Sequence, residues 1–177
     1  MPPHTGSPPQ RVTRRRGGRQ AIVVREATPD DRDAIVGLRM ALLREESRSP
    51  LFADPHPDAE ARTFRITTAQ LMDGEQVFLV ATSGSEIVGA LRCTISAGAP
   101  VLREAARGFL TAAYVMPQFR RKGALRLLVD AAVEWCAARD VHDLRLHCTR
   151  ENVEGNAAWE ALGFEVVEVV RRRRGTP

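Results

Sequence analysis

The chain has few of the features that mark membrane, secreted or metal-binding proteins. No stretch of about 18 apolar residues is present, and no apolar stretch follows the basic N-terminus, so neither a membrane span nor a secretory signal is predicted. Cys93, Cys136 and Cys148 are widely spaced and form no C-x-x-C pair, so no disulfide framework and no metal site are indicated. We expect a cytoplasmic protein with buried, reduced thiols.

Lysine is almost absent, and the positive charge lies at the two ends. Lys122 is the only lysine among 26 basic residues, which we attribute to the codon usage of a GC-rich bacterium. Residues 1–20 and 171–177 hold nine arginines and no acid, whereas residues 21–170 hold 17 basic and 22 acidic residues. The net charge of +4 is therefore a property of the ends. Aromatic residues make up only 5%, so base stacking and a nucleic-acid partner are not expected.

Composition also predicts the domain organisation. Residues 1–20 are rich in proline, glycine and arginine and cannot offset the entropy of ordering, so they are interpreted as a disordered tail. Residues 21–170 are long and apolar enough for one domain with its own core. Residues 171–177 form a basic C-terminal tail.

Hydrophobic periodicity predicts alternating strands and helices from residue 21. The run Thr28-Pro29-Asp30-Asp31 is typical of a helix start, with a Thr cap, a Pro at the first position and acids near the positive helix end. The expected strands are Ala21–Glu26, Val77–Ala81, Ile87–Ile95, Phe109–Val115, Leu144–Cys148 and Phe164–Val170. Four helices are expected. The first follows Thr28, and the second runs from about Asp58 to Gly74 with Ala61, Phe64, Thr68 and Leu71 buried. The third spans Gly123–Arg139 and the fourth residues 154–162. Strand, helix and strand across residues 109–148 imply a parallel pair in an otherwise antiparallel sheet, so the fold class is mixed α/β (α+β).

The segment from residue 115 to 124 carries the clearest chemical pattern. Arg120, Arg121 and Lys122 precede Gly123 at the start of a helix, where backbone amides are unpaired and the dipole is positive. This arrangement binds a phosphate or pyrophosphate. A basic strand-to-helix turn is also typical of a solvated surface loop, so the pattern alone leaves both interpretations open.

Two motifs resemble the GNAT superfamily of acyl-CoA-dependent N-acyltransferases, and the resemblance covers residues 21–170. The family motif V-x-P-x-[YF]-R-x-[KR]-G-x-G is matched by Val115, Pro117, Phe119, Arg120, Lys122 and Gly123. A later motif, an Asn followed by Y-E-x-L-G-F, is matched by Asn152, Trp159, Glu160, Leu162, Gly163 and Phe164, with Trp in place of Tyr.

The resemblance implies a mostly antiparallel six-stranded sheet with helices on both faces and a splayed parallel pair of central strands. Acetyl-CoA would be the cosubstrate, lying in the splay. The cofactor-binding residues implied in this way are Tyr114, Val115, Arg120, Arg121, Lys122, Gly123, Ala124, Leu125, Asn152 and Trp159. The implied reaction is N-acetylation of a primary amine by direct attack in a ternary complex, with a small molecule or a protein N-terminus as acceptor.

The sequence departs from the family at two positions. Leu125 replaces the second motif glycine, and we expect its side chain to face the core and leave its amide free. Trp159 replaces a tyrosine that commonly protonates the departing thiolate, and an indole cannot do so, which leaves water as the donor. His147 stands where some members carry a carboxylate base and is one catalytic candidate, with Tyr114 as the rival.

Two further interpretations stay open. The departures at Leu125 and Trp159 are compatible with a non-catalytic acyl-CoA-binding module. The chain also ends soon after its last expected strand, so the acceptor pocket is either open or completed in a homodimer. An acidic region between the first two helices would attract a cationic amine and consists of Glu45, Glu46, Asp54 and Asp58.

Overall fold

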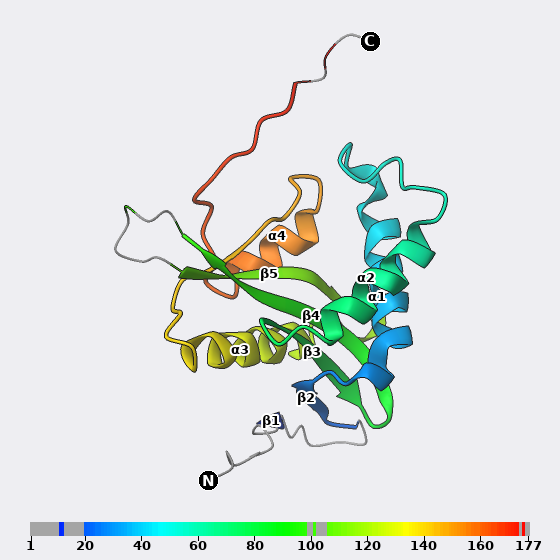
Figure 1. Ribbon diagram of the computed structural model, residues 1–177, viewed down its shortest axis with the longest axis vertical. Coiled ribbons are helices and arrows are strands. Elements are labelled where there is room, and N and C mark those ends of the chain that lie inside the picture. The colour runs from blue at the N-terminus through cyan, green and yellow to red at the C-terminus, as the bar shows by residue number, and fades with distance from the viewer. Residues whose placement is uncertain (1–10, 13–19, 99–100, 102–105, 174, 176–177) are drawn as a thin grey trace. The chain divides into compact units, whose positions relative to one another are not determined.

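The computed structural model of the protein describes residues 11–12, 20–98, 101, 106–173 and 175. One mixed β-sheet forms its framework (Figure 1). The strands follow chain order across the sheet, and only the last pair is parallel. They are β1 (Arg11–Val12), β2 (Ile22–Glu26), β3 (Gln76–Ser83), β4 (Glu86–Ala97), β5 (Ala106–Val115) and β6 (Leu144–Leu146). The chain divides into two compact units, residues 1–147 with the sheet and residues 148–177 with one helix.

Four α-helices accompany the sheet. They are α1 (Arg32–Glu45), α2 (Ala59–Leu71), α3 (Ala124–Ala137) and α4 (Val153–Glu160). Short 3-10 turns cover Pro29–Asp31, Glu46–Arg48 and Pro117–Phe119. No helix within the described part of the chain is both long and apolar enough to cross a membrane.

Helices cover both faces of the sheet in residues 1–147. The α1 side packs Ile35 and Leu38 in one cluster with Ala90 of β4. Cys93 of β4 faces α3, where its sulfur lies 3.4 Å from that of Cys136. Because Ala90 and Cys93 are an odd number of residues apart on one strand, they point to opposite faces. Helix α1 therefore lies on one face and α3 on the other.

The predicted helix start at Thr28 is confirmed and opens a 3-10 turn before α1. The Thr28 N–H donates to Asp31 Oδ2 at 2.7 Å, and Pro29 occupies the first position of the turn. Arg25 donates to both oxygens of the same carboxylate, at 2.6 and 2.8 Å. These bonds, with Arg25 contributing most, hold the pKa of Asp31 below its usual value and fix the entry into α1.

Five of the six expected strands are present as β2 to β6, and the sixth is not. The sequence from Phe164 to Val170 favours a strand by its valines, yet no strand forms there. Val166, Val167, Val169 and Val170 are instead 68–80% exposed. The prediction of a six-stranded sheet that includes this segment is wrong: its valines favour a strand, but the segment pairs with no strand of the sheet that the structure describes. The two-residue β1 adds to the other side of the sheet, inside the segment interpreted as a tail.

The buried face of α2 also differs from the prediction. Thr67 is fully buried, whereas Ala61 is exposed and Thr68 and Leu71 are only half-buried. Phe64 is 38% exposed and lies under the guanidinium of Arg32 at 4.2 Å. Arg39 of α1 donates to the side chains of Thr67 and Gln70 at 2.7 and 2.8 Å. The polar side of α2 thus packs on α1. The hydrogen bonds from Arg39 orient α2 differently from the orientation that its apolar residues predict.

The expectation of buried thiols is confirmed for Cys93 and Cys136, whereas Cys148 is only half-buried. The hydrogen bond with Cys136, together with burial, raises the pKa of Cys93 well above its usual value, so Cys93 is not a nucleophile. In the described residues no group of three or more His, Cys, Asp or Glu side chains is arranged to hold a metal ion.

Candidate functional site

Strand β5 loses one of its two neighbours halfway along its length. Its parallel pairing with β6 spans only three residues and ends at Leu110 opposite Leu146. Its antiparallel pairing with β4 continues to Val115 opposite Gly89. The β6-side edge from Thr111 to Val115 therefore faces no strand among the described residues of 20–147. Backbone N–H and C=O groups along such an edge can bind an extended chain as if it were an added strand.

A β-bulge lies at the point where β5 diverges. Thr111 pairs with Arg92 and Tyr114 with Ala90, so two residues of β5 stand opposite one residue of β4. Ala112 takes a left-handed conformation with φ of 50°. Bulges redirect the strand and release backbone groups from the ladder. Sequence reasoning missed this feature because alanine carries no signal for a positive φ.

The loop after β5 ends in an amide-rich helix start. Arg121 and Gly123 both have positive φ, of 57° and 90°. The first helical hydrogen bond of α3 runs from the Leu127 N–H to the Gly123 carbonyl at 3.0 Å. The amides before Leu127 therefore lack helical acceptors, and the positive end of the dipole adds to them. This geometry supports the predicted anion-binding turn.

The three cations of the loop have three different surroundings. Arg120 donates from Nε to the Val115 carbonyl at 3.0 Å and pairs with Glu45 of α1 at 2.7 Å. Lys122 donates to the Gln118 carbonyl. Arg121 is exposed. The side chain of Arg120 therefore ties the loop to β5 and α1. Glu45, which the sequence analysis assigns to an acidic region for a cationic amine, instead pairs with Arg120.

The face of α3 that packs on the core consists mainly of residues other than Leu125. Ala124 is 2% exposed, and Leu127, Leu128 and Val129 are also buried. Leu125 is only half-buried, at the edge of this face. The expected inward position of Leu125 is thus reached in part, and its backbone still belongs to the first turn of α3.

Tyr114 points from β5 toward α1. Its ring is buried in a cluster with Leu38, Phe78 and Ala90, and the Arg120 guanidinium lies 5.4 Å from the ring centroid. Burial, and then the nearby Glu45 carboxylate, raise the pKa of Tyr114, so the phenol stays protonated. Its predicted backbone contribution is compatible with this orientation, and a proton-carrying role stays a prediction.

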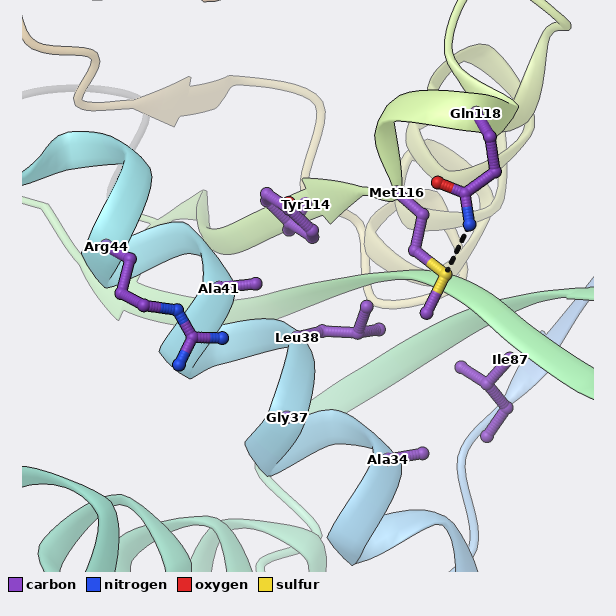
Figure 2. A pocket seen from close by; sticks show the side chains of 9 residues that line it. All are labelled: Ala34, Gly37, Leu38, Ala41, Arg44, Ile87, Tyr114, Met116 and Gln118. Carbon is purple, nitrogen blue, oxygen red and sulfur yellow. Dashed lines mark hydrogen bonds between the residues drawn. The ribbon is translucent and has the colours of Figure 1, made fainter.

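A cavity of about 490 Å³ lies beside Tyr114 (Figure 2). Helix α1 lines one side with small residues, Ala34, Gly37 and Ala41, which leave the space unfilled. The opposite side includes Tyr114 and Met116. The remaining lining residues are Leu38, Arg44, Ile87 and Gln118.

His147 follows β6 and is exposed. Its ring meets the ring of Phe109 edge-on, with the centroids 4.9 Å apart. Phe109 and Thr111 are two residues apart on β5 and share one face, the face that also carries Arg92 opposite Thr111. The candidate base therefore lies over the sheet face that α1 and α2 cover, beside the divergence of β5 and β6.

Asn152 and Trp159 belong to the second unit, residues 148–177. The Asn152 side chain accepts from the Gly155 N–H at 2.8 Å and so caps α4. The half-buried Trp159 meets Phe164 edge-on with ring centroids 5.5 Å apart. Their predicted contacts with a cofactor stay predictions.

Comparison with known proteins decides the family. Residues 40–164 match the Acetyltransferase (GNAT) family. The chain belongs to the GNAT acetyltransferase family. A curated relative, the aminoglycoside N(6')-acetyltransferase type 1 of Stenotrophomonas maltophilia, is 30% identical over 158 residues, which cover 85% of this chain and 90% of the relative.

Solved structures share the GNAT fold. A predicted acetyltransferase from Clostridium acetobutylicum, solved with acetyl-CoA, has a TM-score of 0.72 at 19% identity and covers 86% of this chain and 96% of its own. AAC(6')-Iy, in complex with a bisubstrate analog, CoA-S-monomethyl-acetylneamine, has a TM-score of 0.69 at 20% identity, covering 88% and 99%. This GNAT protein is an acetyl-CoA-dependent acyltransferase, and the predicted family and enzyme class are confirmed.

Proposed function

We propose that this GNAT protein transfers the acetyl group of acetyl-CoA to a primary amine of a small molecule, in a ternary complex. The observation that carries the proposal is the free edge of β5 from Thr111 to Val115, which leads directly into the amide-rich start of α3. An extended arm and an attached pyrophosphate need these two features in this order.

The chain's own residues divide the binding of the cosubstrate among them. Backbone groups near Tyr114 and Val115 bind the pantetheine arm, and the amides of residues 120–125 bind the pyrophosphate. Arg121 and Lys122 add positive charge at the loop. Arg120 holds the loop in position through the Val115 carbonyl and Glu45, at 3.0 and 2.7 Å. Asn152 and Trp159 remain predicted contributors.

The chemistry is nucleophilic acyl transfer. His147 accepts a proton from the protonated acceptor amine, directly or through water, as the general base. The amine nitrogen then bonds to the thioester carbon, and a β5 backbone N–H near the bulge stabilises the charge on the carbonyl oxygen. The carbon–sulfur bond breaks, and its electron pair leaves with the thiolate of coenzyme A. The nitrogen gives its second proton to water, and water supplies the proton of the thiol.

A thiol-release assay tests the proposal. Acetyl-CoA is first titrated to establish binding, and release of free coenzyme A is then measured across a panel of small amines, an aminoglycoside and a peptide with a free N-terminus. Amine-dependent release with at least one small amine is expected. Binding of acetyl-CoA without release for any acceptor would contradict the proposed reaction.

Two variants test the assigned residues in the same assay. His147→Ala is expected to lower turnover and to flatten the acid limb of the pH profile, and an unchanged profile would remove His147 from the reaction. Charge reversal of Arg121 and Lys122 is expected to weaken acetyl-CoA binding and reduce its salt dependence. Charge reversal of the exposed Arg65 on α2 serves as the control.

A further inference from the structure

Two half-buried arginines lie between the sheet and the helices α1 and α2. Arg39 of α1 donates to the side-chain oxygens of Thr67 and Gln70. Arg92 of β4 donates to the side-chain oxygens of Gln76 and Thr111, at 2.6 and 3.3 Å. All four acceptors are neutral. Among the residues that the structure describes, neither guanidinium forms an ion pair with a carboxylate.

The two guanidinium groups belong to one cluster. Arg92 stands directly opposite Phe78 of β3 in the sheet register, so their side chains share one face. The guanidinium of Arg39 lies 5.9 Å from the centroid of the Phe78 ring. One aromatic ring thus lies beside both arginines and brings two positive charges to the same part of the sheet.

The cluster carries an uncompensated charge. Burial lowers the pKa of both arginines, and repulsion from Arg92 lowers that of Arg39 further. The Asp73 carboxylate raises the pKa of Arg92 again in part, but it makes no direct contact with the guanidinium. The side-chain amide of Gln76 lies between the two groups and forms a hydrogen bond with each. Two partly desolvated like charges without a direct counterion are unfavourable, and an oxyanion bound between them would remove that penalty.

The cluster borders the proposed reaction site. Thr111, the acceptor of an Arg92 hydrogen bond, is the first residue of β5 beyond its pairing with β6. The His147 ring lies over Phe109, two residues before Thr111 on the same face. Residues so spaced are ~7 Å apart along a strand. A group bound beside Arg92 and Thr111 therefore lies on the same face of β5 as the His147 ring, about two residues farther along the strand.

We propose that Arg39 and Arg92 bind an oxyanion of the acceptor, so that the acceptor is a small amine bearing a carboxylate or phosphate a few bonds from its nitrogen. This inference rests on the proposed function, since it names the acceptor class of the same site. It also separates this chain from enzymes for polycationic acceptors, because two guanidinium groups beside the reaction site repel such molecules.

The test compares acceptors that differ only in their charge. The thiol-release assay uses β-alanine against β-alaninamide, aminoethyl phosphate against ethanolamine, and an aminoglycoside, each at matched concentrations of unprotonated amine. The expected result is a preference of about 10-fold or more in kcat/KM for a charged member, carried by KM, with the aminoglycoside poorer than either. The two pairs distinguish carboxylate from phosphate recognition.

Variants assign the preference to the two arginines. Arg39→Met and Arg92→Met are expected to reduce it to less than about 3-fold, by raising the KM of the charged members. Arg65→Met, an exposed arginine of α2, is the matched control and should keep the full preference. If a Met variant does not fold, Arg92→Lys and Arg39→Lys replace it and are expected to lower the preference in part, because lysine lacks the bidentate geometry.

The outcomes separate this inference from the proposed function. Equal use of charged and neutral members, or a preference that survives both substitutions, overturns the inference and leaves the acetyltransferase proposal intact. If no amine is acetylated, the proposed function fails, and calorimetric titration with β-alanine and aminoethyl phosphate then decides. Binding that is lost in Arg92→Met supports the oxyanion site, and the absence of binding contradicts it.

Discussion

The two halves of β5 differ in their pairing and in their tasks. Ala106–Leu110 is bonded to β4 on one side, and its last three residues also pair with β6. Thr111–Val115 is bonded to β4 alone, contains the bulge at Ala112 and leads into the cationic loop. The half of β5 that has a strand on both sides belongs to the rigid framework. The half that has a strand on one side only leaves backbone N–H and C=O groups available for a ligand. One strand thus carries both the scaffold and the site, and substitutions in its halves should fail in different ways.

The largest effect is expected in the framework half. A Cβ on Gly108 would stand 2.7 Å from the Cys136 sulfur and 3.2 Å from the Leu144 side chain. Gly108→Val should lower the free energy of unfolding by about 3 kcal/mol through overpacking. Urea denaturation measures this loss. Gly37→Ala, where a Cβ meets nothing within 4 Å, is the control, and a Gly108→Val protein as stable as the control would contradict the packing described.

The next effect is expected at the bulge. Ala112→Val places a β-branched side chain at φ of 50° and should destabilise the fold by about 1–2 kcal/mol. It should also reduce kcat/KM for acetyl-CoA, because the bulge shapes the open edge of β5. Ala112→Gly accepts the same conformation without strain and should keep both properties. Equal behaviour of the two variants in denaturation and kinetics would argue against a constrained bulge.

A smaller effect is expected at the tie between the loop and α1. Arg120→Met and Glu45→Gln should each raise the KM for acetyl-CoA by a few-fold, since the loop loses its anchor. Their stability loss should stay below about 1 kcal/mol, because both side chains are partly exposed. The double variant should be little worse than either single one. Additive losses in KM would show that the two side chains act independently.

The smallest effect is expected at Arg121. This exposed side chain contributes charge alone, so Arg121→Gln should weaken acetyl-CoA binding by about 2-fold at low salt and not at all near 1 M salt. Titration at both ionic strengths measures this. A larger, salt-independent loss would indicate a direct contact and would remove the distinction drawn between Arg120 and its neighbour.

The sequence predicted what depends on neighbouring residues. The helix start at Thr28, the strands β3 and β4 and the helix expected over Gly123–Arg139 follow from local spacing and turn chemistry, and each is present. The cationic loop was recognised as well, because its glycine and its charges are consecutive. These features need no knowledge of distant parts of the chain.

The sequence could not predict what depends on distant partners. Arg120 finds Glu45 75 residues away, and Arg39 finds Thr67 and Gln70 on the next helix. An arginine at such a position has the same local pattern as one on a solvated surface. The strand expected at Phe164–Val170 failed for a similar reason, since its composition says nothing about the availability of an edge.

Amide hydrogen exchange with and without acetyl-CoA tests the central claim most directly, because it needs no acceptor. Saturating acetyl-CoA should slow exchange in Thr111–Val115 and in residues 121–126. Gly108–Leu110, already paired on both sides, should not change. Saturable binding that leaves Thr111–Val115 and residues 121–126 unprotected would contradict the assignment of the open half of β5 as the acetyl-CoA site.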